Sequence, residues 1–155
     1  MAFEILHGDI TKMECDAIVN AANSALQMGG GVCGAIFREA GPLELQRECN
    51  RLGSCETGQA VITKGYTLPA SHVIHTVGPI WHGGNHDEPM LLRACYRNSL
   101  ELAARQGLRS IAFPLISAGI YGYPREEAHQ IAVETIEAFL ETHEMQVYLV
   151  LFDAG

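Results

Sequence analysis

The sequence has no apolar run of the ~18 residues that a membrane-spanning helix needs, and its start has no basic segment followed by a long apolar stretch. We therefore expect neither a membrane partner nor a secretory signal. Internal repeats, low-complexity tracts and linkers rich in proline or serine are also absent. The 155 residues, 48% of them hydrophobic and 18% charged, predict one globular domain over residues 1–155.

Basic side chains are scarce. Ten Lys and Arg residues stand against eighteen Asp and Glu, which gives a formal net charge of −8 with His neutral. Because the Lys and Arg residues form no cluster, this balance fits nucleic-acid binding poorly, and we expect none. An anionic small ligand would have to be held by backbone N–H groups and by helix N-termini instead.

The five cysteines include no C-x-x-C pair. An odd, scattered set of cysteines without a signal peptide predicts free thiols in a reducing cytoplasm. Histidine and aspartate gather at residues 82–87, but that ligand set is too sparse for a metal site, so we expect a solvated loop there. The sequence predicts neither a metal ion nor a bound cofactor.

Six short runs are typical of β-strands. Several are almost purely apolar, which favours strands that are covered on both faces. The runs are residues 3–6, 17–20, 59–64, 72–77, 110–115 and 146–152.

Helical patterns lie between these runs. Pro89 and Pro124 each suit the first position of a helix, because the N–H that proline lacks would be unpaired there in any case. A shorter helix is predicted at residues 32–40, closed by Gly41-Pro42. Strands that alternate with helices predict an α/β/α sandwich with a largely parallel sheet, in which ligands bind outside the carboxyl ends of the strands.

Two loops of small residues each follow a predicted strand and precede a helix, at residues 29–34 and 117–124. Glycine lets the backbone approach a ligand closely, and the start of a helix points unpaired N–H groups into the same space. Each loop alone is equally typical of a surface turn. Two such loops in one short acidic chain favour a clamp on both sides of one diphosphate.

Three single residues have an open interpretation. Asp9, after the first strand, either accepts a hydrogen bond from an exocyclic amine such as that of adenine or caps the following turn. Cys33, near a helix N-terminus, suits a nucleophile, but no histidine in the sequence is identifiable as its partner. His75, within an apolar strand, is predicted to be a core imidazole bonded to the backbone.

These segments, in this order, resemble the macrodomain family, whose fold binds ADP-ribose. The resemblance is closest to the branch that removes acetyl from O-acetyl-ADP-ribose and cleaves mono-ADP-ribosyl esters from acidic side chains. It implies a three-layer α/β/α sandwich with a mixed, largely parallel six-stranded sheet. The segments that carry it are residues 8–11, 16–23, 29–34, 75–79, 97–102 and 117–124.

The resemblance implies roles for individual residues. Asp9 and the backbone of Ile10 would bind the adenine amine, and Phe152 would pack on the adenine ring. Asn23 would hold a hydroxyl of the distal ribose, and Tyr121 would flank that ribose. The diphosphate would lie between two loops, the first lined by Gly31, Val32 and Cys33 and the second by Ser117, Ala118, Gly119, Ile120 and Tyr121.

Two features depart from the family pattern. Many enzymes of this branch carry Asp at the position of Cys33, and an ordinary thiol is mostly neutral at pH 7, where Asp is ionised. Three outcomes are open: water oriented by Asn23 and activated by the substrate's own diphosphate, Cys33 acting as a thiolate, or a binding module with slow catalysis. Relatives also often continue into another helix, which predicts a domain that lacks this C-terminal helix.

The resemblance therefore implies a metal-independent hydrolase of an ester on the distal ribose, with Asn23 and Cys33 as its catalytic residues. The expected ligands are ADP-ribose or O-acetyl-ADP-ribose, and the expected protein partners are ADP-ribosylated proteins. A non-catalytic ADP-ribose reader is the alternative that Cys33 favours. A remoter alternative is a nucleotide-cofactor enzyme that uses the pattern Gly29-x-Gly31-x-x-Gly34.

Overall fold

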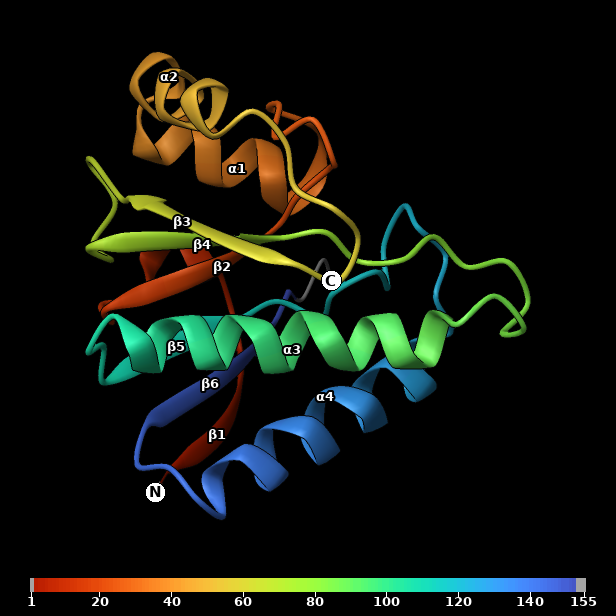
Figure 1. Ribbon diagram of the computed structural model, residues 1–155. Helices are drawn as coiled ribbons and strands as arrows, with labels where there is room; N and C mark the ends of the chain where they lie inside the picture. Colours follow the sequence, from red (N-terminus) through yellow and green to blue (C-terminus); the bar gives the residue numbers. More distant parts are fainter. Residues whose placement is uncertain (1, 153–155) are drawn as a thin grey trace.

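The computed structural model describes residues 2–152 and shows three layers, with a six-stranded sheet between two pairs of helices (Figure 1). The order of strands in the sheet is β1-β6-β5-β2-β4-β3. The expected α/β/α sandwich is confirmed. The strands are β1 (Phe3–His7), β2 (Ala17–Ala21), β3 (Ala60–Lys64), β4 (His72–Thr76), β5 (Ser110–Phe113) and β6 (Gln146–Leu151).

Five of the strands run parallel, and only β3 pairs antiparallel, with β4. The sheet is thus mixed and largely parallel, as expected. In the register of the central pair, Val19 of β2 lies opposite Ile74 of β4. Because the five parallel strands end at the same edge, the loops that follow them gather along that edge.

Helices cover both faces of the sheet (Figure 1). α1 (Gly31–Ala40) and α2 (Pro42–Leu52) pack on one face, and α3 (Glu88–Arg105) and α4 (Arg125–Leu140) pack on the other. Side chains of β2 alternate between the two cores, with Val19 in the core under α3 and Ile18 in the core under α1. Within residues 2–152, none of these helices has the length and hydropathy that a membrane crossing requires.

The helix α2 was missed by the sequence analysis. Gly41-Pro42 was predicted to close a helical region, but it joins two helices. Gly41 ends α1 with a φ of 108°, a conformation that favours glycine, and Pro42 occupies the first position of α2. Glu44 in the first turn of α2 is a further signal that the sequence offered.

Tyr96 of α3 connects the helix layer to the segment that follows β5. Its side chain is fully buried, and its hydroxyl donates to the carbonyl of Pro114 at 3.2 Å and accepts from the N–H of Ile116 at 3.0 Å. Since β5 ends at Phe113, these two bonds satisfy backbone groups that the sheet no longer pairs. Tyr96 therefore fixes the start of the loop that contains Ser117.

We predict that Tyr96→Phe lowers the free energy of unfolding by about 1–3 kcal/mol, because it leaves buried backbone groups without partners. Urea denaturation measures the change. The matched control is Tyr148→Phe, on a half-buried tyrosine of β6, which should change the value by less than about 0.5 kcal/mol. Equal losses in the two variants would show that the Tyr96 hydroxyl bonds do not stabilise the fold.

Candidate functional site

Asp9 and Phe152 follow neighbouring strands, β1 and β6, at the carboxyl edge. The N–H of Gly8 donates to the carbonyl of Leu151 at 3.0 Å, which holds the two strand ends side by side. Asp9 Oδ1 accepts from the N–H and the hydroxyl of Thr11, at 2.9 and 2.7 Å. The capping interpretation is thus observed. Both bonds use one oxygen of an exposed carboxylate, and the other oxygen has no hydrogen-bond partner among residues 2–152, so it can accept from a ligand.

Phe152 and Ile10 differ in how far their side chains are exposed. Phe152 is 65% exposed, so its ring is open to a flat ligand, whereas the side chain of Ile10 is buried beneath the short 3-10 helix of residues 10–12. Only the backbone of Ile10 is therefore suited to a direct contact. The adenine contacts that the resemblance implies for these residues stay a prediction.

The first glycine loop leads directly into α1. Gly30 is the N-cap and supplies no side-chain bond, so the first N–H groups of the helix stay open to an anion. Gly31 and Val32 lie in the first turn, and Cys33 follows them with its side chain buried. A Cβ atom on Gly34 would overlap the carbonyl oxygen of Gly29, so glycine at position 34 lets the loop fold back against the helix.

The second loop is held in an unusual backbone conformation. Ser117 has a φ of +66°, in the left-handed region, and its buried hydroxyl has no hydrogen-bond partner among the described residues. The hydroxyl packs against Gly78, where a Cβ atom would collide with it. Further along the loop, Ala118 and Tyr121 are half-buried, while Gly119 and Ile120 are exposed.

The two loops approach one another at the same edge of the sheet. The Cδ1 atom of Ile120 lies 3.9 Å from the position that a Cβ atom on Gly30 would occupy. The loop after β4 is bonded to the second of these loops, because the N–H of Trp81 donates to the carbonyl of Tyr121 at 2.8 Å. The fold thus brings together the two loops from which the sequence predicted a clamp.

Asn23 and Cys33 share one acceptor. Asn23 Nδ2 donates to the carbonyl oxygen of Gln27 at 2.8 Å, and its Oδ1 accepts from the N–H of Gln27 at 2.9 Å. Cys33 Sγ donates to the same carbonyl oxygen at 3.7 Å. The two predicted catalytic residues are therefore neighbours. Asn23 keeps one N–H and one lone pair for a ligand.

A buried polar chain lies behind Cys33. Asn20 Nδ2 donates to Cys33 Sγ at 3.6 Å and contacts His75 Nδ1 at 3.1 Å, and His75 Nε2 contacts Thr63 Oγ1 at 2.9 Å. Because the amide nitrogen of Asn20 can only donate, Nδ1 is the acceptor and the proton of the neutral imidazole lies on Nε2. His75 is buried as expected, but its partners are side chains rather than the backbone.

His75 also reaches Cys33 through Asn20, a connection that the sequence did not reveal. Burial lowers the pKa of His75 to about 4, so the imidazole is neutral at pH 7. Within residues 2–152, the hydrogen bonds of Cys33 go only to a neutral amide and a carbonyl. Nothing in this arrangement supplies the sulfur with a base.

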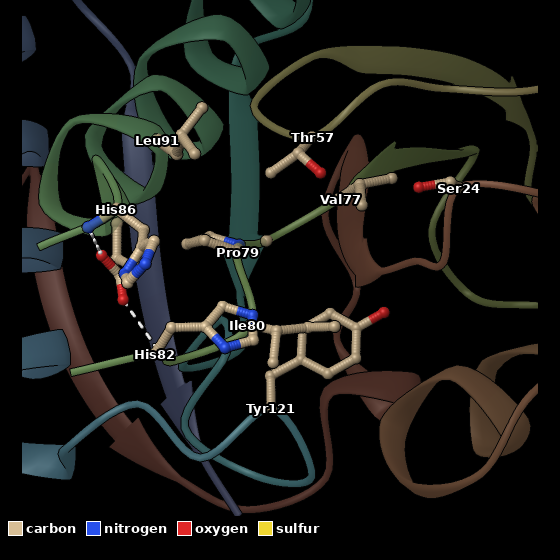
Figure 2. A pocket seen from close by; sticks show the side chains of 11 residues that line it. Ser24, Thr57, Val77, Pro79, Ile80, His82, His86, Leu91 and Tyr121 are labelled. Atoms are coloured by element: carbon tan, nitrogen blue, oxygen red, sulfur yellow. Dashed lines mark hydrogen bonds between the residues drawn. The ribbon is translucent and has the colours of Figure 1, made fainter. Parts of the chain in front are cut away.

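A pocket of about 260 Å³ opens beside Tyr121 (Figure 2). Its lining combines apolar side chains with hydroxyl and imidazole groups. It is lined by Ser24, Thr57, Val77, Gly78, Pro79, Ile80, His82, His86, Glu88, Leu91 and Tyr121.

Glu88, the first residue of α3, holds the loop beside this pocket. Its buried carboxylate accepts from the N–H groups of His82, Gly84 and His86 at 2.7, 3.1 and 2.6 Å. Burial by itself raises the pKa of Glu88, but these backbone donors outweigh it and lower the pKa to about 2. Sequence reasoning missed Glu88, although an acidic residue just before Pro89 is a signal for a helix start.

The loop of residues 82–87 was expected to be solvated, and its His82 and His86 are exposed. In the described part of the chain, no three His, Cys, Asp or Glu side chains gather in a way that would hold a metal ion. Ser24 and Thr57 also line the pocket, and no pattern in the sequence pointed to them.

We predict that His75 stays neutral, with its proton on Nε2, down to a titration midpoint near pH 4. An unfolded chain binds this proton near pH 6.5, so the contribution of His75 to stability is lost as the pH falls from 6.5 toward 4. Imidazole nitrogen shifts measured by NMR report both the tautomer and the midpoint. A midpoint above pH 6, or a proton on Nδ1, contradicts the hydrogen-bond chain.

Comparison with known families and proteins gives a consistent result. The sequence profile of the Macro domain family matches residues 19–132. A "Macro domain-containing protein" of Chlorobaculum tepidum is 61% identical over 135 residues, which is 87% of this chain and 78% of that protein. A protein of Escherichia fergusonii named O-acetyl-ADP-ribose deacetylase is 53% identical over 155 residues, covering 96% of this chain and 87% of that protein.

Solved structures agree with these relatives. The Oceanobacillus iheyensis macrodomain with ADP superimposes with a TM-score of 0.93 at 46% identity, over 98% of this chain and 84% of that one. The Trypanosoma brucei macrodomain in complex with ADP-ribose gives a TM-score of 0.90 at 46% identity, over 97% of this chain and 63% of that one.

Proposed function

The chain belongs to the macrodomain family, and from that premise we propose that it binds ADP-ribose along the carboxyl edge of its sheet and hydrolyses an ester on the distal ribose. The observation that carries the proposal is the meeting of the two glycine-containing loops, at Gly30 and Ile120, in a chain of net charge −8. Such a chain has to neutralise a diphosphate with backbone N–H groups.

The order of the strands supports one orientation of the ligand. The adenine lies beside Asp9 and Phe152, at the ends of β1 and β6. The diphosphate lies at the ends of β5 and β2, where the N-terminus of α1 and the loop of residues 117–121 present N–H groups. The distal ribose then reaches Asn23 and Tyr121. This path follows the sheet from its β1 edge toward β4.

The proposed reaction depends on positioning rather than on a strong base. A water molecule held by the free amide positions of Asn23 attacks the acyl carbon, and the bond between that carbon and the ribose oxygen breaks. One proton of the water passes to an oxygen of the substrate's own diphosphate, which then gives that proton to the ribose oxygen as it leaves. The products are the free acid and ADP-ribose. The N–H groups in the first turn of α1 stabilise the negative charge that develops beside the loop of residues 29–34 during the attack.

Cys33 favours a second candidate function, a non-catalytic reader of ADP-ribose. Cys33 is 6% exposed, and its sulfur is hydrogen-bonded to a neutral amide and a carbonyl, in the position where the resemblance places an acidic residue. A site without a base binds its ligand as well as an enzyme does and turns it over slowly.

We predict that the protein gives a saturable calorimetric titration with ADP-ribose and releases acetate from O-acetyl-ADP-ribose. Asn23→Ala should reduce the rate of acetate release by about 10²-fold, because the attacking water loses its orientation. Gln27→Ala, which alters the exposed neighbour of Asn23 but keeps its backbone groups, is the matched control. Binding without turnover selects the reader function, and absence of binding rejects the proposal altogether.

Exchange of the thiol for a carboxylate separates the two functions further. We predict that Cys33→Asp raises the rate of ester hydrolysis by about 10²-fold, the usual contribution of a general base. Cys33→Asn, which is similar in size but neutral, should give no such gain. If the native enzyme is already as fast as Cys33→Asp, then Cys33 itself performs the role of the base. The ADP-ribose affinity of each variant shows that its cleft is intact.

A further inference from the structure

The side chain of Asn23 takes its orientation from the loop that follows it. Asn23 comes two residues after the end of β2, and both polar atoms of its amide are bonded to the backbone of Gln27, at 2.8 and 2.9 Å. These two bonds fix the plane of the amide, and with it the directions of the N–H and the lone pair that remain for a ligand. The orientation of Asn23 therefore depends on where the backbone of Gln27 lies.

Gln46 of α2 holds the backbone on both sides of Gln27. Its Oε1 accepts from the N–H of Met28 at 2.9 Å, and its Nε2 donates to the carbonyl of Leu26 at 2.9 Å. Asn50, one turn further along α2, accepts from the same Nε2 at 3.0 Å and from the side-chain amide of Gln27 at 3.1 Å. A single planar amide that bonds to residues 26 and 28 thus fixes the position of the residue between them.

The loop depends on this support because it has no regular structure and contains a strained residue. Residues 22–30 belong to no strand or helix, and within residues 2–152 the N–H groups of Gln27 and Met28 are paired only with side chains. Leu26 has a φ of +56°, in the left-handed region that leucine rarely adopts. Such a conformation persists only where its surroundings determine it. The bond from Gln46 to the carbonyl of Leu26 is one of the contacts that do so.

We propose that Gln46 is a positioning residue for the distal ribose: through the backbone of Gln27, it sets the direction in which Asn23 presents its free amide positions. The inference rests on the proposed function, in which Asn23 contacts that ribose and orients the attacking water. Gln46 makes no ligand contact of its own, since both polar atoms of its amide are bonded to the loop. The helix α2, which supplies none of the expected ligand contacts, thus supports the residue that orients the ligand.

The test compares the binding of ADP-ribose with that of ADP, because ADP lacks the distal ribose. The ratio of their dissociation constants, measured by calorimetry, reports the contacts made to that ribose and needs no turnover. For the unaltered protein, we expect ADP-ribose to bind about tenfold more tightly than ADP, the effect of one or two neutral hydrogen bonds. Gln46→Met, which is similar in length but has no amide, should lower this ratio below about three and leave the affinity for ADP within about twofold.

A double-mutant cycle shows whether Gln46 acts through Asn23. Asn23→Ala should lower the ratio by itself, and the addition of Gln46→Met should cause no further fall, because the group that Gln46 positions is already gone. The rate of acetate release should follow the same pattern, with a loss of about tenfold in Gln46→Met alone. Gln130→Met, on an exposed glutamine of α4, is the matched control and should keep both the ratio and the rate.

An unchanged ratio in Gln46→Met overturns the positioning role and leaves the proposed function intact. If the affinity for ADP and the unfolding midpoint fall together with the affinity for ADP-ribose, Gln46 only stabilises the fold. A double variant that falls below Asn23→Ala shows that Gln46 acts independently of Asn23, and the inference is rejected. If the unaltered protein has no turnover, the reader function is selected and the ratio still decides the role of Gln46. If Asn23→Ala keeps the full ratio, or ADP-ribose does not bind, the proposed ligand contact fails and this inference fails with it.

Discussion

Parallel pairing of five strands is the constraint on which the candidate site depends. It brings the ends of β1, β6, β5, β2 and β4 to one edge, so that segments far apart in the chain become neighbours. The strand ends next to Asp9 and Phe152, from opposite ends of the described chain, are hydrogen-bonded through Gly8 and Leu151, and the loops of Gly30 and Ile120 approach one another. In a chain with few cations, this gathering of backbone N–H groups is what makes an anion site possible.

Glycine occupies two positions where the backbone packs closely against a neighbouring loop. Gly34 lets the first loop fold against α1, and Gly78 leaves room for the hydroxyl of Ser117. Behind the cleft, a series of side-chain hydrogen bonds connects Thr63, His75, Asn20 and Cys33, and all of these groups are polar and neutral. The same neutrality that makes burial of these groups tolerable deprives Cys33 of a base. Binding and catalysis thus place different demands on one region.

Much of this arrangement was predictable, since the apolar runs and the glycine loops lie where the structure has them. The α2 helix was missed because Gly41-Pro42 signals an end and a start equally well. His75 was recognised as buried, but its link to Cys33 depends on the pairing of β2 with β4, which joins residues 55 positions apart. Glu88 was missed because its partners are backbone N–H groups. Every residue except proline has one, so the sequence does not show which of them a side chain will bind.

The sequence by itself determined the strands, three of the four α-helices found within residues 2–152, the acidic net charge and the two small-residue loops, because hydrophobic periodicity, charge and glycine content are local properties. Only the tertiary structure decided which of these segments face one another. The pocket between Thr57, His86 and Tyr121 and the position of Cys33 among neutral groups exist because the sheet order brings distant loops together. Contacts between residues so far apart in the sequence depend on how the whole chain packs, and no local sequence pattern predicts them.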